Sequence, residues 1–283
     1  MSTSFIFGTV GSPIETPKKP GGSVGAIEYS KSLGLQALEL GWVQSVRIGE
    51  AACQNINACS KNHVVQLSVH APYFINLNAN EDEWPKSRKR LMDAAFYGNL
   101  AGATDIVFHP GSYFNHLPDE VLPRTIERLA GCVQEIRQTG NPVTLRPETM
   151  GKQAMLGSLE DTLRMSVEID GVEPCLDFAH LHARNGDGSV NTRAEWLEIL
   201  ERYRKLLGDD SMKHLHIHIS GINYGAKGEK SHLPVNESDL DIKAIFQALK
   251  ELNTGGRILC ESPQMEKDAL ILKQQWHEIN KED

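Results

Sequence analysis

Short runs of apolar, β-branched residues alternate along the chain with longer segments whose apolar residues recur at helical spacing. The short runs predict eight strands, at residues 4–8, 36–41, 64–70, 104–109, 142–148, 173–178, 214–220 and 257–262. The longer segments predict a helix after each strand, at residues 23–33, 46–61, 85–101, 118–138, 158–168, 192–207, 238–251 and 264–279. Ser158, before Glu160 and Asp161, and Pro85 are typical of helix starts.

Strict alternation of strands and helices predicts a parallel sheet with crossover helices. Eight units in 283 residues give about 35 residues each, close to the length of about 30 expected of one such unit. Eight units predict a closed (β/α)8 TIM barrel, spanning residues 1–283 as a single domain. A doubly wound open sheet is the competing fold. Residues 11–22 and 221–237 are expected to form long polar loops.

The composition is that of an ordinary globular protein, with 40% hydrophobic and 23% charged residues. No apolar run approaches the roughly 18 residues that cross a bilayer, so we expect no membrane segment. The net charge of −8 argues against a simple nucleic-acid binder, unless bound cations reverse the local sign. Five cysteines without a Cys-x-x-Cys pair favour a reducing cytoplasm, and Cys175 and Cys260 lie in apolar runs that predict burial. We expect a monomer.

Side chains that bind metals fall at the end of six consecutive predicted strands. In a barrel these ends form one rim, where active sites lie. The set contains three carboxylates, whose mutual repulsion a cation would relieve. Imidazole and carboxylate without thiolate suit zinc, manganese or iron. The sequence therefore predicts a metal site made by His70, His109, Glu148, Asp177, His180, His218 and Glu261.

Other histidines are assigned by their distance from this rim. His216 precedes His218 by two residues, so it lies on the same face of the strand, one layer deeper. Glu229 and His232, in the long loop after the seventh strand, could bind a further metal. His63, His116 and His277 lie outside any cluster and are expected at the surface.

With these residues in place, the chain resembles the endonuclease IV family, trinuclear zinc enzymes that incise DNA at abasic sites. The resemblance spans nearly the whole chain, and its specificity comes from the order of several short motifs. These are Val69-His70-Ala71-Pro72-Tyr73-Phe74-Ile75-Asn76-Leu77, His109-Pro110-Gly111, Pro147-Glu148-Thr149, Asp177-x-x-His180, the strand end at His218, and Glu261-Ser262-Pro263.

The resemblance implies two to three zinc ions per chain, with manganese as the alternative. Glu148 would bridge two zinc ions; His70 and His109 would complete the first site, and Asp177, His218 and Glu261 the second. His180 would serve the third. The family also contributes an Asp-x-His pair to the third ion, whereas this chain has Glu229-x-x-His232. The third site is therefore expected to differ from that of the family.

The resemblance also implies a substrate and a mechanism. The partner would be damaged double-stranded DNA, contacted by Tyr73 and Phe74 from the loop after the third strand. The loop after the second strand matches the family less closely, and Arg47 or Gln44 is its candidate DNA contact. The reaction would be hydrolysis 5′ to the abasic site by hydroxide formed on a bound metal, with Glu148 bridging the metals and Glu261 orienting or deprotonating the water.

Two other functions fit the same residues. Sugar isomerases and epimerases of related barrels hold one divalent metal with a Glu–Asp–His–Glu set, here Glu148, Asp177, His218 and Glu261. Such an enzyme has no evident need for His70, His109 and His180 as ligands. A non-catalytic metal-binding or nucleic-acid-binding protein is the remaining possibility, and the altered loop after the seventh strand motivates it.

Overall fold

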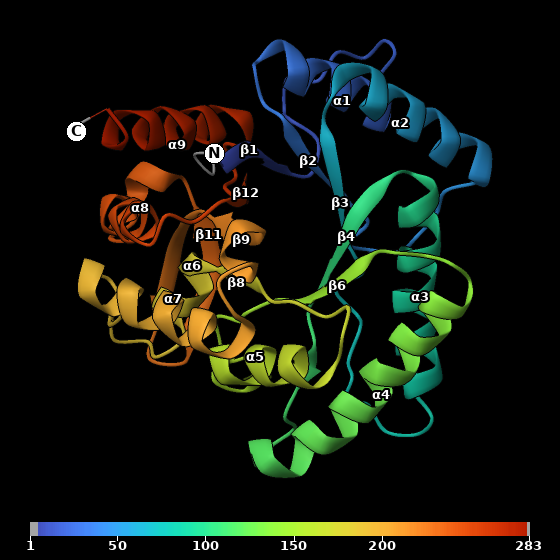
Figure 1. Cartoon of the computed structure of the whole chain (residues 1–283), viewed down its shortest axis with the longest axis vertical. Helices are drawn as coiled ribbons and strands as arrows, with labels where there is room; N and C mark the ends of the chain where they lie inside the picture. The colour runs from blue at the N-terminus through green and yellow to red at the C-terminus, as the bar shows by residue number, and fades with distance from the viewer. Residues whose placement is uncertain (1–4, 282–283) are drawn as a thin grey trace.

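The computed structural model describes residues 5–281, so the predicted start of the first strand at Ser4 lies outside the described residues. Eight parallel strands pair in the order β6-β4-β3-β2-β1-β12-β9-β8. Single bridges from Leu145 to Val172 and from Glu148 to Cys175 join β6 to the segment at β8, which closes the sheet into a barrel (Figure 1). The strands are β1 (Phe5–Val10), β2 (Ala37–Gly41), β3 (Gln66–His70), β4 (Ala103–Phe108), β6 (Thr144–Pro147), β8 (Cys175–Asp177), β9 (Leu215–Ile219) and β12 (Gly256–Cys260). The predicted TIM barrel is confirmed.

A helix follows each of these strands and packs on the outside of the barrel. These helices are α1 (Gly22–Ser32), α2 (Glu50–His63), α3 (Trp84–Leu100), α4 (Pro118–Gln138), α5 (Leu159–Glu168), α7 (Arg193–Leu207), α8 (Ile242–Glu251) and α9 (Glu266–Ile279). The predicted start signals hold: the Ser158 side chain accepts a hydrogen bond from the backbone N–H of Asp161, and Pro85 lies in the first turn of α3. The start of the second helix was predicted too early, because residues 46–49 are irregular.

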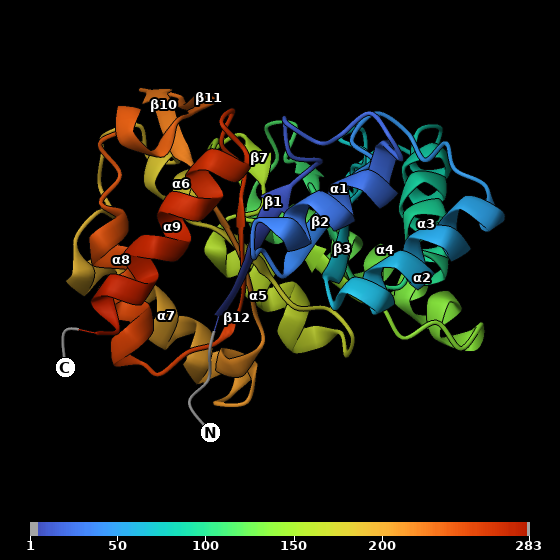
Figure 2. The ribbon, with the colours of Figure 1, turned by 90° about the horizontal axis from the view of Figure 1, so that it is seen from above.

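The structure adds elements that the sequence pattern did not predict. A short helix, α6 (Phe178–Ala183), follows β8 directly. The predicted loop at 221–237 contains an antiparallel hairpin of β10 (Gly221–Gly225) and β11 (Gly228–Leu233) and the 3₁₀ turn η2 (Val235–Glu237). A second short pair joins β5 (Gly111–Ser112) to β7 (Met155–Leu156), and η1 (Ser211–Lys213) precedes β9. The hairpin stands at the rim formed by the carboxyl ends of the strands, which faces up in Figure 2.

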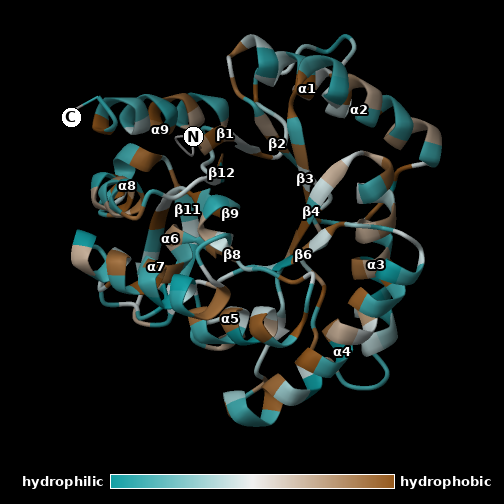
Figure 3. Ribbon diagram, in the orientation of Figure 1, coloured by the Kyte–Doolittle hydropathy of each residue, from teal (hydrophilic) through white to brown (hydrophobic). Residues whose placement is uncertain are grey.

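Apolar side chains of the strands and helices form the core between the two layers. Figure 3 shows hydrophobic and hydrophilic residues alternating along the helices. The largest fully buried side chains include Trp196, Tyr203 and Phe108. All five cysteines are free and buried, as predicted for Cys175 and Cys260. Within residues 5–281, no helix has both the length and the apolar composition needed to cross a bilayer. The helix layer therefore supports the barrel and leaves the rim open for polar side chains.

Candidate metal centre

The predicted ligands meet at the rim because parallel strands bring their carboxyl ends to one side. His70 and Asp177 are the last residues of β3 and β8, and His218 is paired with Asp177 in the neighbouring strand. The residues that directly follow β4, β6 and β12 are His109, Glu148 and Glu261. Most of these ligands are completely buried, so the centre is enclosed on the side of the barrel interior. The completely buried ones are His70, Glu148, Asp177 and His218.

Glu148 lies at the middle of this cluster and faces four imidazoles. Its Oε2 atom lies 3.3 Å from Nε2 of His70 and 3.2 Å from Nε2 of His109. Its Oε1 atom lies 3.3 Å from Nδ1 of His180 and 3.5 Å from Nδ1 of His218. One carboxylate thus contacts ring nitrogens from four different segments of the barrel.

The ligand atoms fall into three overlapping groups, in each of which all atoms lie within 4.8 Å of one another. Glu148 is shared by the first two groups and Asp177 by the last two. A carboxylate that belongs to two groups could contact two neighbouring cations, as in sites where two metal ions lie about 3.5–4 Å apart. The groups are His70, His109 and Glu148; Glu148, Asp177, His218 and Glu261; and Asp177, His180 and His232.

Glu148 and the imidazoles around it favour each other's charged forms. Burial opposes the ionisation of Glu148, but contacts with His109, His180 and His218 outweigh it and hold the pKa of this carboxyl well below its usual range. Burial would lower the pKa of His70, but the contact with Glu148 raises it to about 9. For Asp177, burial is the dominant effect and raises the pKa. Protons on the rings thus carry the positive charge that cations would otherwise supply.

Several buried polar atoms of the centre have no hydrogen-bond partner among the described residues. A buried polar atom without a partner costs about 1–3 kcal/mol, so such atoms are rare and need an explanation. Imidazole nitrogens and carboxylate oxygens are the donors that zinc binds. These atoms are Glu148 Oε1, Asp177 Oδ2, Glu261 Oε2 and both ring nitrogens of His218, whose contacts with charged neighbours lack hydrogen-bond geometry. The residues present therefore fit a metal cluster.

The loop ligands also reach the centre. Nδ1 of His180 lies 2.9 Å from the carbonyl of Thr149, a contact that would keep the proton of a neutral ring on Nδ1 and make Nε2 available to a metal. Oε2 of Glu229 lies 3.6 Å from that Nε2 atom, although Glu229 is outside the three groups. The His232 ring lies 5.2 Å from the His180 ring, centroid to centroid. His180, Glu229 and His232 are thus placed together.

Gly151 makes the approach of Glu229 possible. A Cβ atom at position 151 would lie 2.7 Å from Cβ of Glu229 and 3.0 Å from the ring of His180. The backbone N–H of Glu229 donates to the carbonyl of Gly151 at 2.8 Å. The hairpin can therefore dock at the rim only because residue 151 has no side chain.

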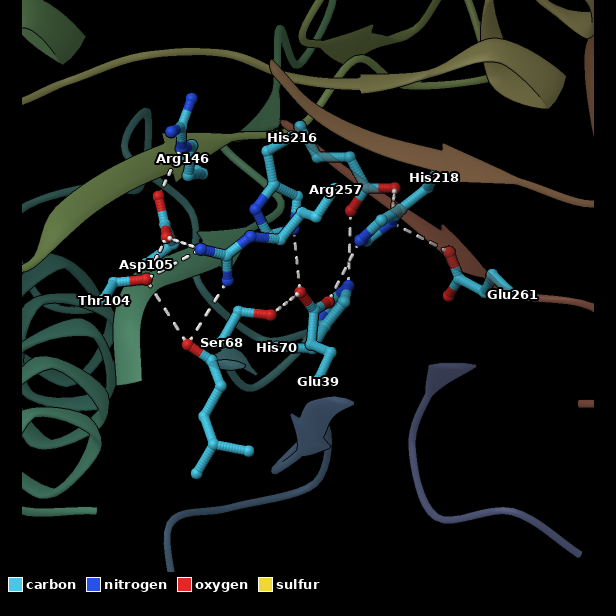
Figure 4. A network of polar contacts seen from close by, with 12 residues as sticks. Glu39, Ser68, His70, Thr104, Asp105, Arg146, His216, His218, Arg257 and Glu261 are labelled. Atoms are coloured by element: carbon cyan, nitrogen blue, oxygen red, sulfur yellow. Dashed lines mark hydrogen bonds and ion pairs between the residues drawn. The ribbon is translucent and has the colours of Figure 1, made fainter. Parts of the chain in front are cut away.

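The sequence analysis missed Glu39, a completely buried acidic partner of the centre. Figure 4 shows its carboxylate among side chains from β3 and β9. Ser68 donates to it at 2.6 Å, Nε2 of His216 lies at 3.0 Å and Nε2 of His218 at 3.1 Å. His216 therefore lies one layer below the rim, as predicted. The only sequence signal for Glu39 is a carboxylate inside an otherwise apolar strand.

The predicted DNA-contacting residues lie in rim loops. Tyr73 and Phe74 are 42% and 60% exposed, and the Tyr73 ring stacks on His109 with ring centroids 5.0 Å apart. Arg47 is exposed in the irregular segment between β2 and α2. The backbone N–H of Tyr73 donates to the carbonyl of Val43, which joins these two loops.

The chain belongs to the xylose isomerase-like TIM barrel family, whose model matches residues 27–280. Over 276 residues, which cover 97% of this chain and 98% of the relative, it is 35% identical to an uncharacterised protein of Methanocaldococcus jannaschii. Over 226 residues, 74% of this chain and 71% of the relative, it is 27% identical to a probable endonuclease 4 of Staphylococcus aureus. Proteins named as probable endonuclease 4 are thus among the chain's relatives in sequence.

Two solved structures are equally similar in fold. Endonuclease IV from Thermus thermophilus superposes with a TM-score of 0.73 and 19% identity, over 97% of this chain and 100% of that chain. A D-tagatose 3-epimerase-like protein superposes with the same TM-score of 0.73 and 19% identity, over 98% of this chain and 99% of that chain. These superpositions show the fold and do not separate a nuclease from an epimerase.

Proposed function

We propose that this protein is a metal-dependent phosphodiesterase that hydrolyses DNA on the 5′ side of abasic sites. The observation that supports this most is the set of four imidazoles around Glu148. A single cation needs only the group of Glu148, Asp177, His218 and Glu261. His70, His109 and His180 would then be redundant as ligands, and for the buried rings of His70 and His180 unpaired polar groups are costly.

The ligands would hold two to three zinc ions, with manganese as the alternative. When bound, such ions activate a water molecule and neutralise the charge that develops on the phosphate. His70, His109 and Glu148 would hold one ion, and Glu148, Asp177, His218 and Glu261 another. His180 and His232 would hold a third with Glu229, whose longer side chain replaces the shorter acidic residue of the endonuclease IV family.

Glu261 would orient the attacking water. Its side chain is 14% exposed, so it faces the opening of the rim while Glu148 is completely buried. Burial would raise the pKa of Glu261, but His232 and His218 outweigh it and hold the pKa at about 2. An acid this strong stays ionised at neutral pH and accepts a hydrogen bond from water, and it is too weak a base to store a proton.

The exposed aromatic residues would bind the DNA next to the lesion. Stacking of a base on an aromatic side chain contributes about 1–3 kcal/mol. Tyr73 joins the two parts of the site, because one side of its ring stacks on His109 and 42% of its surface remains accessible. Phe74 lies next to it, with Cζ of Arg90 at 6.0 Å from its ring centroid. Arg47 would contact a phosphate. The five buried, free cysteines suit the reducing cytoplasm as the place of action.

A second candidate function is sugar isomerisation or epimerisation. The group of Glu148, Asp177, His218 and Glu261 favours it, since these four residues would hold one cation and the two Glu side chains could exchange protons with carbon beside a carbonyl. Non-catalytic binding of abasic DNA is the third candidate.

The decisive experiment is incision of a duplex that carries one tetrahydrofuran abasic analogue, with the undamaged duplex as control. Zinc-loaded wild type should nick the modified strand 5′ to the analogue in multiple turnovers. His109→Ala should abolish nicking and lower the bound zinc, because His109 belongs to a ligand group that a multinuclear nuclease needs. A single-cation isomerase would not need His109 as a ligand. Folded protein that fails to nick with either zinc or manganese would rule out the proposal. Tight binding without turnover would indicate the third candidate.

A further inference from the structure

Three side chains that bind metals meet between α1 and α2, which lie side by side on the outer wall of the barrel (Figures 1 and 2). Cys59 and His63 are four residues apart on α2, so they project from the same face of that helix. Glu28 comes from α1. The ligand atoms of the three side chains all lie within 4.8 Å of one another.

Within residues 5–281, these three side chains have few polar contacts outside the cluster. The Glu28 carboxylate and the His63 imidazole have no hydrogen bond or ion pair in that part of the chain, and the Cys59 thiol has one long contact, 3.8 Å from the carbonyl of Val24. Burial and the negative charge of Glu28 both raise the pKa of Cys59. His63, expected from the sequence to be an isolated surface residue, is half-buried and belongs to this cluster.

The donor set is typical of zinc. Thiolate, imidazole and carboxylate are the three side-chain types that zinc binds, and three protein ligands leave the fourth tetrahedral position to water. Bond lengths of about 2.0–2.3 Å place tetrahedral ligand atoms about 3.5 Å apart. Glu28 is exposed, so its side chain can rotate to close the remaining distance. A cation would also reverse the repulsion between Glu28 and a Cys59 thiolate.

We propose that Glu28, Cys59 and His63 form a second metal site, which takes a zinc-class divalent cation and is separate from the rim. α2 ends at His63 and β3 begins at Gln66, whereas the rim ligand His70 is at the other end of β3. The site therefore lies at the end of the barrel away from the candidate active centre. It does not depend on the proposed function.

Cobalt is the probe that separates the two sites, because a cobalt ion bound by thiolate absorbs in the near ultraviolet through sulfur-to-metal charge transfer. Among the described rim groupings, only Cys175, beside His216 and His218, could add a thiol. The protein is titrated with Co²⁺ as wild type, Cys59→Ser, Cys175→Ser and Cys53→Ser. Cys53→Ser is the matched control, since Cys53 is a buried thiol on the same helix.

We expect the charge-transfer band in wild type, Cys175→Ser and Cys53→Ser. Cys59→Ser should lose the band and should bind one metal ion fewer per chain. Glu28→Gln keeps the fold, because Glu28 is exposed, and should weaken cobalt binding at this site by at least about tenfold. A wild type without the band, or a band that persists in Cys59→Ser, would overturn the proposal. If Cys59→Ser does not fold, unchanged cobalt affinity in Glu28→Gln would overturn it equally.

Discussion

Replacing Glu39 with glutamine tests whether this buried carboxylate supports the metal centre. The carboxylate accepts a hydrogen bond from Ser68 at 2.6 Å and lies 3.0 Å and 3.1 Å from the rings of His216 and His218. Glutamine has nearly the same shape but carries one acceptor oxygen and an NH2 group, which would face a ring N–H. The change therefore removes one charge-assisted hydrogen bond and leaves buried donors without a partner.

The expected magnitude follows from these contacts. Loss of one charge-assisted hydrogen bond in the interior should lower the free energy of unfolding by about 1.5–3 kcal/mol. Glu39 also orients His218, whose Nδ1 atom faces Glu261 at 3.2 Å. The substitution would therefore let the His218 ring rotate away from the orientation that metal binding needs. Loss of such an orienting partner weakens metal binding by about 10–100-fold.

The assay is zinc affinity by competition with a chelator, measured beside chemical unfolding of the metal-free protein. Asp161→Asn is the matched control, because Asp161 is also a buried carboxylate, with hydrogen bonds to Tyr113, Gly157 and Ser158 rather than to the centre. Both variants should lose stability, and only Glu39→Gln should lose zinc affinity. Wild-type zinc affinity in a destabilised Glu39→Gln protein would refute the reasoning.

Three further predictions concern the rim and the opposite end of the barrel. Gly151→Ala should remove one zinc ion per chain by pushing the side chains of Glu229 and His180 away, whereas Gly131→Ala, with open space around its Cβ position, should not; equal zinc contents would contradict this. Zinc binding at pH 7 should release protons and weaken as the pH falls. Contact with Glu148 outweighs burial and raises the pKa of His70 to about 9, whereas the ring must be neutral to bind zinc. Calorimetry in two buffers of different ionisation enthalpy measures the released protons, and no release would contradict the prediction. Asp105→Ala should lower the free energy of unfolding by about 3–5 kcal/mol, since Arg146 and Arg257, at 2.7 Å and 3.0 Å, would lose their buried partner; a loss under about 1 kcal/mol in urea would be incompatible with it.

The barrel and most of its rim were predictable because both depend on local patterns. Alternation of strands and helices determines the topology, and the topology brings the carboxyl ends of parallel strands together. His70, Asp177 and Glu261 could therefore be grouped from their positions in the sequence alone. Ligands at strand ends need no knowledge of side-chain packing to be recognised.

Glu39 could not be assigned in this way, because its partners come from β3 and β9, far away in the chain. The sequence of β2 is typical of a buried strand and contains one acidic residue. Only the contacts with Ser68 and the two histidines of β9 explain why that residue is buried. The β10–β11 hairpin was missed because its strands are short and largely polar. The helical pattern likewise continued through residues 46–49, where Gly49 precedes the true start of α2.

Zinc content measures the central claim most directly, and the Cys59→Ser variant restricts the count to the rim. The Cys59→Ser protein, purified without chelator and loaded with zinc, should contain two to three ions per chain, in accord with the three ligand groups at the rim. A third ion would also show that Glu229 and His232 replace the shorter pair of the endonuclease IV family. A single ion per chain would contradict the account and favour a sugar isomerase, leaving His70 and His109 without a role as ligands.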